Sequence, residues 1–323
     1  MSFMPIKQTT YQGPPFYLFN GHLETIIPSL YRKVEGLNYL REKIPTPDND
    51  FLNLDWSKVG SRRLLIISHG LEGDSERHYV RGLAKLFNSN QIDVLAWNNR
   101  SCGGEMNLQP VLYHHGADYD LKTVISYVVD KYDYEEIFLT GISMGGAQTL
   151  NYLGKNSEAL PAQITKAAVY STPCDLPSSA ATLKSRRNVF YKKRFLGKLK
   201  DKMRRKALQF PDLIDLDLLE QVQDFDSFDT LFTAKLHGFE DARDFYQSAS
   251  PGPWIEKVPI PTLIVNALND PLLGEECYPV KLAERKSEII LEMPKRGGHT
   301  GFILSKNEFT WAEYRFLRFF LEE

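Results

Sequence analysis

The chain has 323 residues, of which 42% are hydrophobic and 25% are charged, as in an ordinary water-soluble globular protein. Its formal net charge of −2 excludes the general attraction to nucleic acid or to anionic membranes that a strongly basic protein would show. The three cysteines, Cys102, Cys174 and Cys277, are odd in number and far apart, which argues against a disulfide framework and against a metal site.

The chain starts with a proline- and aromatic-rich stretch, residues 1–34, in which no basic region precedes an apolar core. We therefore expect no signal peptide. No apolar run in the sequence approaches the roughly 18 residues that a bilayer span requires. These observations predict a cytoplasmic protein with reduced thiols and no stable membrane insertion. The apolar side chains of this stretch are expected to pack on the main domain: Tyr17, Phe19, Leu23, Ile26, Ile27 and Leu30.

Short apolar runs alternate with amphipathic segments along most of the chain, which predicts strands alternating with helices. Strands are expected at 39–46, 50–56, 64–68, 92–97, 137–140, 167–171, 262–267 and 288–293, and helices at 79–87, 121–128, 147–153 and 308–321. In the last helix, we expect Trp311, Tyr314, Leu317 and Leu321 to face inward. The alternation predicts an α/β protein, with a mostly parallel twisted sheet and helices on both faces.

One segment, residues 175–246, interrupts this alternation because it contains no convincing strand. We interpret it as a helical lid, inserted over the carboxyl edge of the sheet. Residues 1–174 and 247–323 would then form one core domain together.

The inserted segment carries two runs of opposite charge. Residues 184–206 contain twelve lysines or arginines and one acid, Asp201, whereas residues 212–229 contain seven acids and no base. Either the two runs neutralise each other and the rest is solvated surface, or the basic run binds an anionic lipid, a phosphate or an acidic partner. Mutual neutralisation is the simpler interpretation.

A serine flanked by glycines lies between a predicted strand and a predicted helix. The strand at 137–140 leads into the turn GISMGG, which has Ser143 at its centre, and apolar residues from Ala147 onward indicate the helix. This arrangement is the nucleophile elbow, which holds a serine side chain clear of the sheet. Such a tight turn requires glycine where a Cβ would collide, here Gly141 and Gly145. We predict that Ser143 is a nucleophile; a simple glycine turn is the alternative.

A nucleophilic serine needs a base to accept its proton and an acid to orient that base. In the fold suggested here both partners follow the serine, on loops after later strands. His299 lies just after a pair of glycines beyond the last predicted strand, and Asp270 follows the strand before it. We predict that Ser143, His299 and Asp270 form a catalytic triad, with Asp175 as the alternative acid.

The oxyanion that forms during acyl transfer needs two backbone N–H donors. One should be the amide of Met144, because it lies at the N-terminus of the helix after the nucleophile. The other should come from the loop 69–73, where Leu71 is the predicted donor. His69 is expected to support this loop rather than to act as a second base.

Six motifs extend along most of the chain, and together they resemble the YheT-like group of α/β-hydrolases. They are NGHLETI at 20–26, HGLEG at 69–73, NNRSCGG at 98–104, GISMGG at 141–146, NALNDP at 266–271 and GGHTGF at 297–302. The resemblance implies an α/β-hydrolase fold and a serine hydrolase of carboxylic esters, with Ser143, Asp270 and His299 as the triad. The sequence departs from the family's usual pattern at Ala147, where asparagine is common, and at Asn269, where an acid is common.

The sequence is consistent with three functions. The first is an esterase or lipase-like hydrolase that uses no metal or organic cofactor and acts on a small-molecule or lipid ester. The second is an acyltransferase with the same acyl-enzyme, because residues 69–74 spell H-x-x-x-x-D. The third is a binding protein that holds an anionic partner on its basic run and leaves the triad idle. Aromatic residues in the 175–246 segment indicate a hydrophobic acyl or alcohol group in the substrate.

Overall fold

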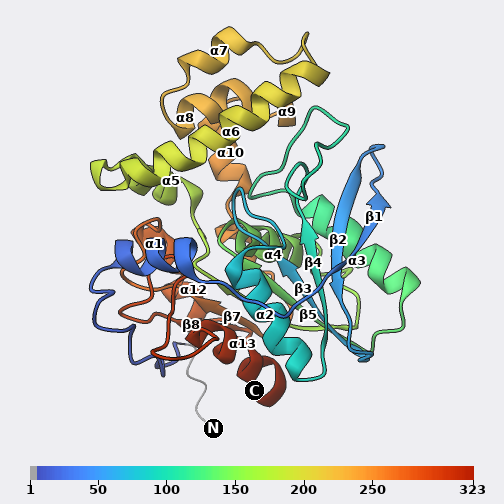
Figure 1. The fold of residues 1–323 in the computed structure, drawn as a ribbon, viewed down its shortest axis with the longest axis vertical. Helices are drawn as coiled ribbons and strands as arrows, with labels where there is room; N and C mark the ends of the chain where they lie inside the picture. Colours follow the sequence, from blue (N-terminus) through green and yellow to red (C-terminus); the bar gives the residue numbers. More distant parts are fainter. Residues whose placement is uncertain (1–5) are drawn as a thin grey trace.

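The computed structural model describes residues 6–323, which build one central eight-stranded sheet (Figure 1). The strand order is β1-β2-β4-β3-β5-β6-β7-β8; β2 runs antiparallel to both of its neighbours, and every pair from β4 to β8 is parallel. The strands are β1 (Leu40–Pro45), β2 (Phe51–Ser57), β3 (Arg63–Ser68), β4 (Asp93–Asn98), β5 (Glu136–Ile142), β6 (Ile164–Tyr170), β7 (Thr262–Val265) and β8 (Ile289–Glu292). The predicted, mostly parallel α/β sheet is therefore confirmed.

Helices cover both faces of this sheet and fill the long connection between β6 and β7. The helices are α1 (Gly21–Tyr31), α2 (His78–Ser89), α3 (Asp118–Lys131), α4 (Met144–Lys155), α5 (Leu176–Lys184), α6 (Val189–Gln209), α7 (Leu216–Gln221), α8 (Phe225–Phe228), α9 (Lys235–His237), α10 (Ala242–Ala249), α11 (Gly252–Ile255), α12 (Val280–Ala283) and α13 (Trp311–Glu322). Short 3-10 turns lie at Arg186–Asn188 and Glu275–Cys277, and a π-helical turn lies at Asp229–Ala234.

The two faces of the sheet carry separate hydrophobic cores, because successive residues of a strand point to opposite sides. In β3, Leu64 and Ile66 pack in the core that includes α3 and α4. Leu65 and Ile67 pack in the other core, which includes α2 and α13. Every one of these four side chains is at most 1% exposed, so β3 is a central strand buried on both faces.

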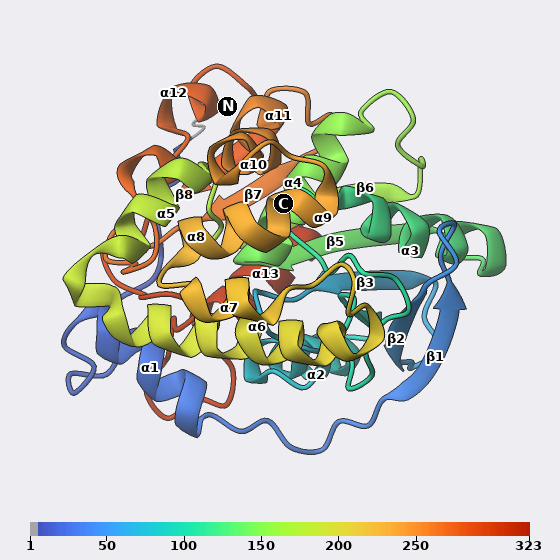
Figure 2. The same ribbon diagram turned by 90° about the horizontal axis from the view of Figure 1, so that it is seen from above.

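The described residues 175–246 contain helices and no strand, as expected (Figures 1 and 2). Figure 1 shows α6 to α9 above one edge of the sheet, and Figure 2 shows α6 crossing over the core domain from above. Apolar side chains of this segment, including Leu199, Met203 and Phe225, form a third core together with Met144, the residue after the predicted nucleophile. The segment therefore packs directly above the elbow.

The predicted inward face of the last helix is correct only in part. In α13 Trp311 is buried and Leu317 packs against the core, as predicted, but Tyr314 and Leu321 are each 38% exposed. The other buried aromatic side chains are Phe316, Phe319 and Phe320. From Trp311 to Leu317 the expectation followed steps of three residues. Each such step falls about 60° short of a full helical turn, so the predicted stripe drifts away from the true face.

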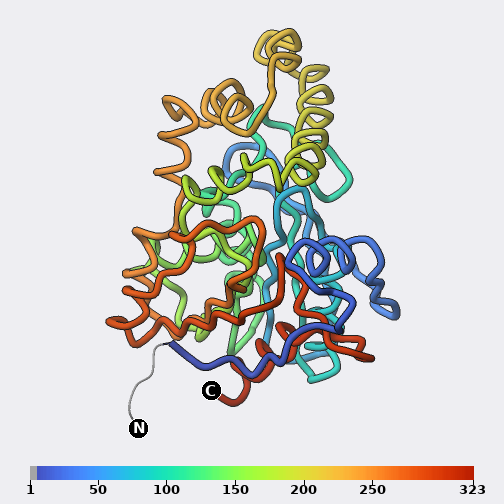
Figure 3. The backbone as a smooth tube through the Cα atoms, turned by 90° about the vertical axis from the view of Figure 1, so that its left-hand side faces the viewer, coloured from blue at the N-terminus to red at the C-terminus, as the bar shows by residue number. Residues whose placement is uncertain are grey.

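The predicted packing of the N-terminal stretch is wrong for Tyr17, Phe19 and Leu30, whose side chains are 53% to 70% exposed. Leu23, Ile26 and Ile27 are half-buried. The buried side chains of α1 include Glu24 and Thr25, which make polar contacts instead. Figure 3 shows the N-terminal segment beside the C-terminal part of the chain at the base of the molecule. Hydrogen bonds from buried polar side chains thus help to hold the N-terminal helix in place.

Candidate active site

The turn between β5 and α4 has the geometry of a nucleophile elbow. Ser143 has φ 56° and ψ −119°, a conformation that a residue with a side chain rarely adopts. A Cβ added to Gly141 would lie 2.2 Å from the carbonyl oxygen of Gly145, and one added to Gly145 would lie 2.1 Å from that of Ser68. Both predicted glycine requirements are therefore confirmed, and they hold the elbow close against β3.

Ser143, His299 and Asp270 lie in one continuous hydrogen-bonded chain. The Oγ of Ser143 is 2.9 Å from Nε2 of His299, and Nδ1 of His299 is 2.8 Å from Oδ2 of Asp270. The side chain of Asp270 is fully buried and that of His299 is 10% exposed. Since an ionised carboxylate only accepts hydrogen bonds, Asp270 keeps the proton on Nδ1 and leaves Nε2 free to accept one from Ser143.

The structure separates the two acids that the sequence left as candidates. Asp175 caps the N-terminus of α5, where its Oδ1 accepts a hydrogen bond from the amide of Ser178 at 2.8 Å. The imidazole of His299 is bonded to Asp270 instead. The arrangement therefore favours Asp270 as the orienting acid.

The loop after β3 lies against Ser143 and carries one of the two predicted oxyanion donors. A Cβ added to Gly70 would lie 3.2 Å from that of Ser143. Within residues 6–323, neither the amide of Leu71 nor that of Met144 donates a hydrogen bond to another group of the protein. Two free N–H groups thus flank the serine, as a site that binds an oxyanion requires.

His69 has the structural position that was predicted for it. Its side chain is 1% exposed, Nδ1 donates to the carbonyl of Gly70 at 2.8 Å, and Nε2 accepts from the amide of Asn99 at 3.1 Å. Burial lowers the pKa of His69 to about 4, so the ring is neutral near pH 7. With both ring nitrogens engaged by backbone groups, His69 braces the loop and has no free basic nitrogen.

The N-terminal helix α1 anchors the loop that carries His299, and the sequence analysis did not predict this. The buried carboxylate of Glu24 accepts hydrogen bonds from Arg296 at 2.6 Å, from the amide of Gly297 at 2.5 Å and from the side chain of Asn269 at 3.0 Å. The hydroxyl of Thr25 accepts from the amide of His299 at 2.8 Å. The signal was present in the motif at 20–26, where two polar residues lie in the middle of an apolar helix.

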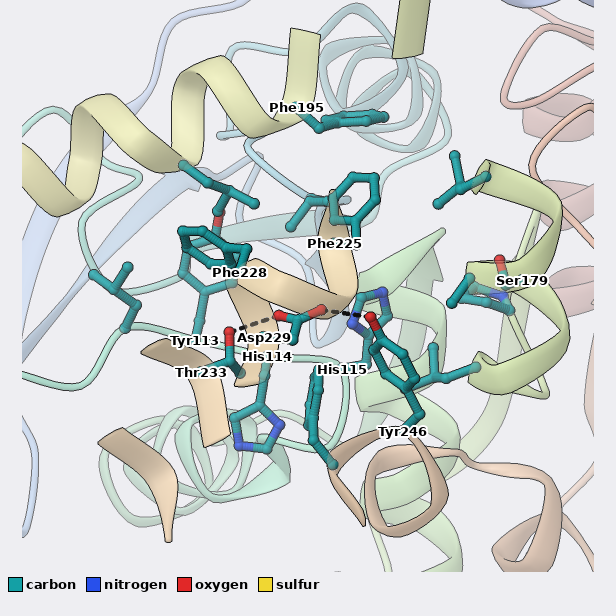
Figure 4. A pocket seen from close by; sticks show the side chains of 18 of the residues that line it. Tyr113, His114, His115, Ser179, Phe195, Phe225, Phe228, Asp229, Thr233 and Tyr246 are labelled. Atoms are coloured by element: carbon teal, nitrogen blue, oxygen red, sulfur yellow. Dashed lines mark hydrogen bonds between the residues drawn. The ribbon is translucent and has the colours of Figure 1, made fainter. Parts of the chain in front are cut away.

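An apolar cavity lined by Ser143 and His299 extends into the 175–246 segment, and Figure 4 shows part of its lining. Figure 4 shows Phe195, Phe225 and Phe228 gathered around one side of it. Leu199 and Met203 of α6 and leucine side chains of the core domain, such as Leu71, add to the apolar lining. The cavity is thus suited to a hydrophobic chain, because apolar surface is favourably removed from water there.

A polar cluster lies in the wall of this apolar cavity. The buried carboxylate of Asp229 accepts hydrogen bonds from Thr233 at 2.6 Å and from Tyr246 at 2.8 Å, both drawn in Figure 4. Burial raises the pKa of Asp229 to about 7, and the nearby carboxylate of Asp226 adds to the shift. The neighbouring ring of His114 is kept neutral by its own burial, which holds its pKa well below the usual value.

The basic and acidic runs of the inserted segment pair with each other in part. Among the described residues, the salt bridges that join the two runs are Lys184 to Asp226 and Arg204 to Glu220. Two other cations of α6 turn inward: Lys202 pairs with Glu72 of the core domain at 2.7 Å, and Lys206 donates to backbone carbonyls. Most of the positive charge on α6 is therefore not used by the acidic run.

The family model for the alpha/beta hydrolase fold matches residues 63–306, and the chain belongs to this family. Among its relatives, the YheT protein of Escherichia coli (strain K12) is 28% identical over 88% of this chain and 84% of its own length. Human phospholipase ABHD3 is 27% identical over 93% of this chain and 75% of its own length. A monoacylglycerol lipase of Saccharomyces cerevisiae is 28% identical over 86% of this chain and 63% of its own length.

These similarities confirm that the chain is a YheT-like α/β-hydrolase, and they agree with the predicted class of carboxylic ester hydrolases. The Pyrococcus furiosus esterase Pf2001 superposes with a TM-score of 0.56 over 97% of both chains, at 18% identity, which supports the fold alone. No helix between residues 6 and 323 is both long and apolar enough to cross a bilayer. Across that same range, no three His, Cys, Asp or Glu side chains come together as metal ligands would.

Proposed function

We propose that this protein hydrolyses carboxylic esters through an acyl-enzyme on Ser143. The observation that carries the proposal is the chain of short contacts from Ser143 through His299 to the buried Asp270, at the mouth of an apolar cavity. A serine hydroxyl is a weak nucleophile by itself, and this arrangement supplies the base and the oriented acid that it needs.

In the first half of the reaction, Ser143 Oγ attacks the ester carbonyl carbon while Nε2 of His299 accepts its proton. The negative charge moves to the carbonyl oxygen, where the amides of Leu71 and Met144 donate hydrogen bonds to it. His299 then gives its proton to the departing alcohol as the carbon–oxygen bond breaks. In the second half, His299 activates a water molecule, which releases the carboxylic acid from Ser143.

We further propose that residues 175–246 act as the lid of this site and hold the acyl chain. Their aromatic and aliphatic side chains line the cavity that opens at Ser143. The relatives named as phospholipase and monoacylglycerol lipase are consistent with a lipid-like acyl group. An acyl chain that fills this cavity would exclude water from the site, which strengthens the hydrogen bonds to the oxyanion.

Two measurements test the proposal. A fluorophosphonate probe should label Ser143, and a series of p-nitrophenyl esters of increasing acyl length should be hydrolysed with a preference for apolar chains. An unlabelled wild-type protein would support the idle-triad alternative. Faster acyl transfer to an added alcohol than to water would support the acyltransferase.

A further inference from the structure

A second cavity also opens at the candidate nucleophile and has a different chemistry. It shares Ser143 and His299 with the apolar cavity, so the two meet at the reacting atoms. Its walls include three cationic side chains, Arg77 from the turn before α2 and Arg194 and Lys198 from α6. An ester bound at Ser143 therefore has one apolar and one cationic space beside it.

The three cations of this second cavity have no carboxylate partner among residues 6–323. Arg77 and Lys198 each donate to the backbone carbonyl of Glu72, at 2.9 Å and 3.3 Å, and none of the three forms a salt bridge. Burial lowers the pKa of Arg194 and of Lys198, and the charge of Arg77 lowers both further. The three positive charges thus lie close enough to repel one another.

Nearby carboxylates do not cancel this charge. Glu72 and Asp74 both act on Lys198, but Glu72 is already paired with Lys202 at 2.7 Å. Together, Arg77, Arg194, Lys198 and Lys202 carry four positive charges, and Glu72 and Asp74 carry two negative charges. An excess of two positive charges therefore remains next to the cavity. Partly buried cations that repel one another destabilise the fold unless an anion joins them, and such clusters are typical of binding sites.

We infer that the second cavity binds a phosphate group on the alcohol part of the ester, held by Arg77, Arg194 and Lys198. This inference rests on the proposed ester hydrolysis at Ser143 and names its substrate class. A phosphate carries up to two negative charges and several acceptor oxygens, which match the excess charge and the donors of two arginines and a lysine. An apolar acyl chain placed there would remove the cations from water without a counter-charge, so the acyl chain belongs in the other cavity.

The test compares two esters with the same short acyl chain, a 1-acylglycerol and the corresponding 1-acylglycerol 3-phosphate, both below their micelle concentrations. Wild-type protein should hydrolyse the phosphate ester with a kcat/KM at least about tenfold higher. In the double variant Arg194→Gln/Lys198→Gln, this ratio should fall about tenfold or more, since charge-assisted contacts are lost. Lys193→Gln is the matched control, because Lys193 is an exposed cation of α6 that does not line the cavity.

A measurement on the wild-type protein tests the same inference even if the double variant does not fold. Glycerol 3-phosphate should inhibit hydrolysis of the neutral 1-acylglycerol competitively and at least about tenfold more strongly than glycerol, and this difference should shrink as salt is added. Offering the phosphate ester in neutral vesicles as well as in solution distinguishes a lipid headgroup from a soluble phosphate ester. Equal hydrolysis of the two esters, or equal inhibition by the two alcohols, would overturn the inference while ester hydrolysis stands. If no ester is hydrolysed at all, the proposed function fails with it.

Discussion

Replacing Glu24 by glutamine should damage the candidate active site from a position outside it. All partners of the Glu24 carboxylate are donors: the guanidinium of Arg296, the amide of Gly297 and the side-chain NH₂ of Asn269. A carboxylate accepts from all of them, whereas the NH₂ of a glutamine must face at least one donor. The side chain of Glu24 is 1% exposed, so water cannot replace the lost bonds.

The size of this effect follows from the number of bonds. Hydrogen bonds to a charged group contribute about 1.5–3 kcal/mol each, and glutamine keeps roughly half of the acceptor capacity, so we expect a loss of about 3 kcal/mol. If this free energy is lost from the positioning of His299, kcat/KM should drop by about 100-fold, mostly through kcat. If it is lost from the free energy of unfolding of the whole chain, Tm should drop by about 4 °C for a chain of this length.

The assay is hydrolysis of a p-nitrophenyl ester, with thermal unfolding followed in parallel. Glu256→Gln is the control, because Glu256 forms an exposed ion pair with Arg285 at 3.1 Å. Such surface pairs contribute about 0–1 kcal/mol, so the control should match wild type in both assays. A Glu24→Gln protein with wild-type kcat/KM and wild-type Tm would show that the His299 loop holds its position without α1.

Three further changes probe the site itself. Ser143→Ala should abolish fluorophosphonate labelling and leave the far-UV circular dichroism unchanged; labelling that persists would move the nucleophile elsewhere. Asp270→Asn should lower kcat by about 10³-fold or more, and a larger loss in Asp175→Asn would contradict the assigned acid. Asp229→Asn should gain stability relative to wild type as the pH rises. The wild-type carboxyl ionises near pH 3.8 when unfolded but near 7 when folded, so wild type loses about 4 kcal/mol between these values. A Tm difference between the two proteins that does not change from pH 4 to pH 8 would refute the raised pKa.

The sheet and the predicted triad could be found from the sequence because their signals are local. A buried strand is a short apolar run, and the elbow at Ser143 needs glycines at fixed positions around it. Once the strands are placed, the order of a parallel sheet brings the loops with Asp270 and His299 to the same edge. The contact between these side chains is then a consequence of the topology.

The supporting contacts could not be found in this way, because they depend on segments that are distant in the sequence. Nothing near Glu24 indicates that its partners are about 270 residues further along the chain. Likewise, the charges of α6 form one uniform run in the sequence, but in the structure Lys202 turns to the core domain and Arg194 to a cavity. Only the docking of α6 on the core domain decides which cation has which neighbour.

The anchoring of His299 by α1 also has a consequence for how the protein is made. Residues 24 and 25 leave the ribosome well before the residues they bind, because 297 and 299 are 273 and 274 positions further along the chain. Domains begin to fold during synthesis at about 5–20 residues per second, so α1 has to wait many seconds for the loop that it holds. A nascent chain can therefore bury much of its sheet while still unable to attack any ester. Esterase activity would appear only when the loop that carries His299 is in place.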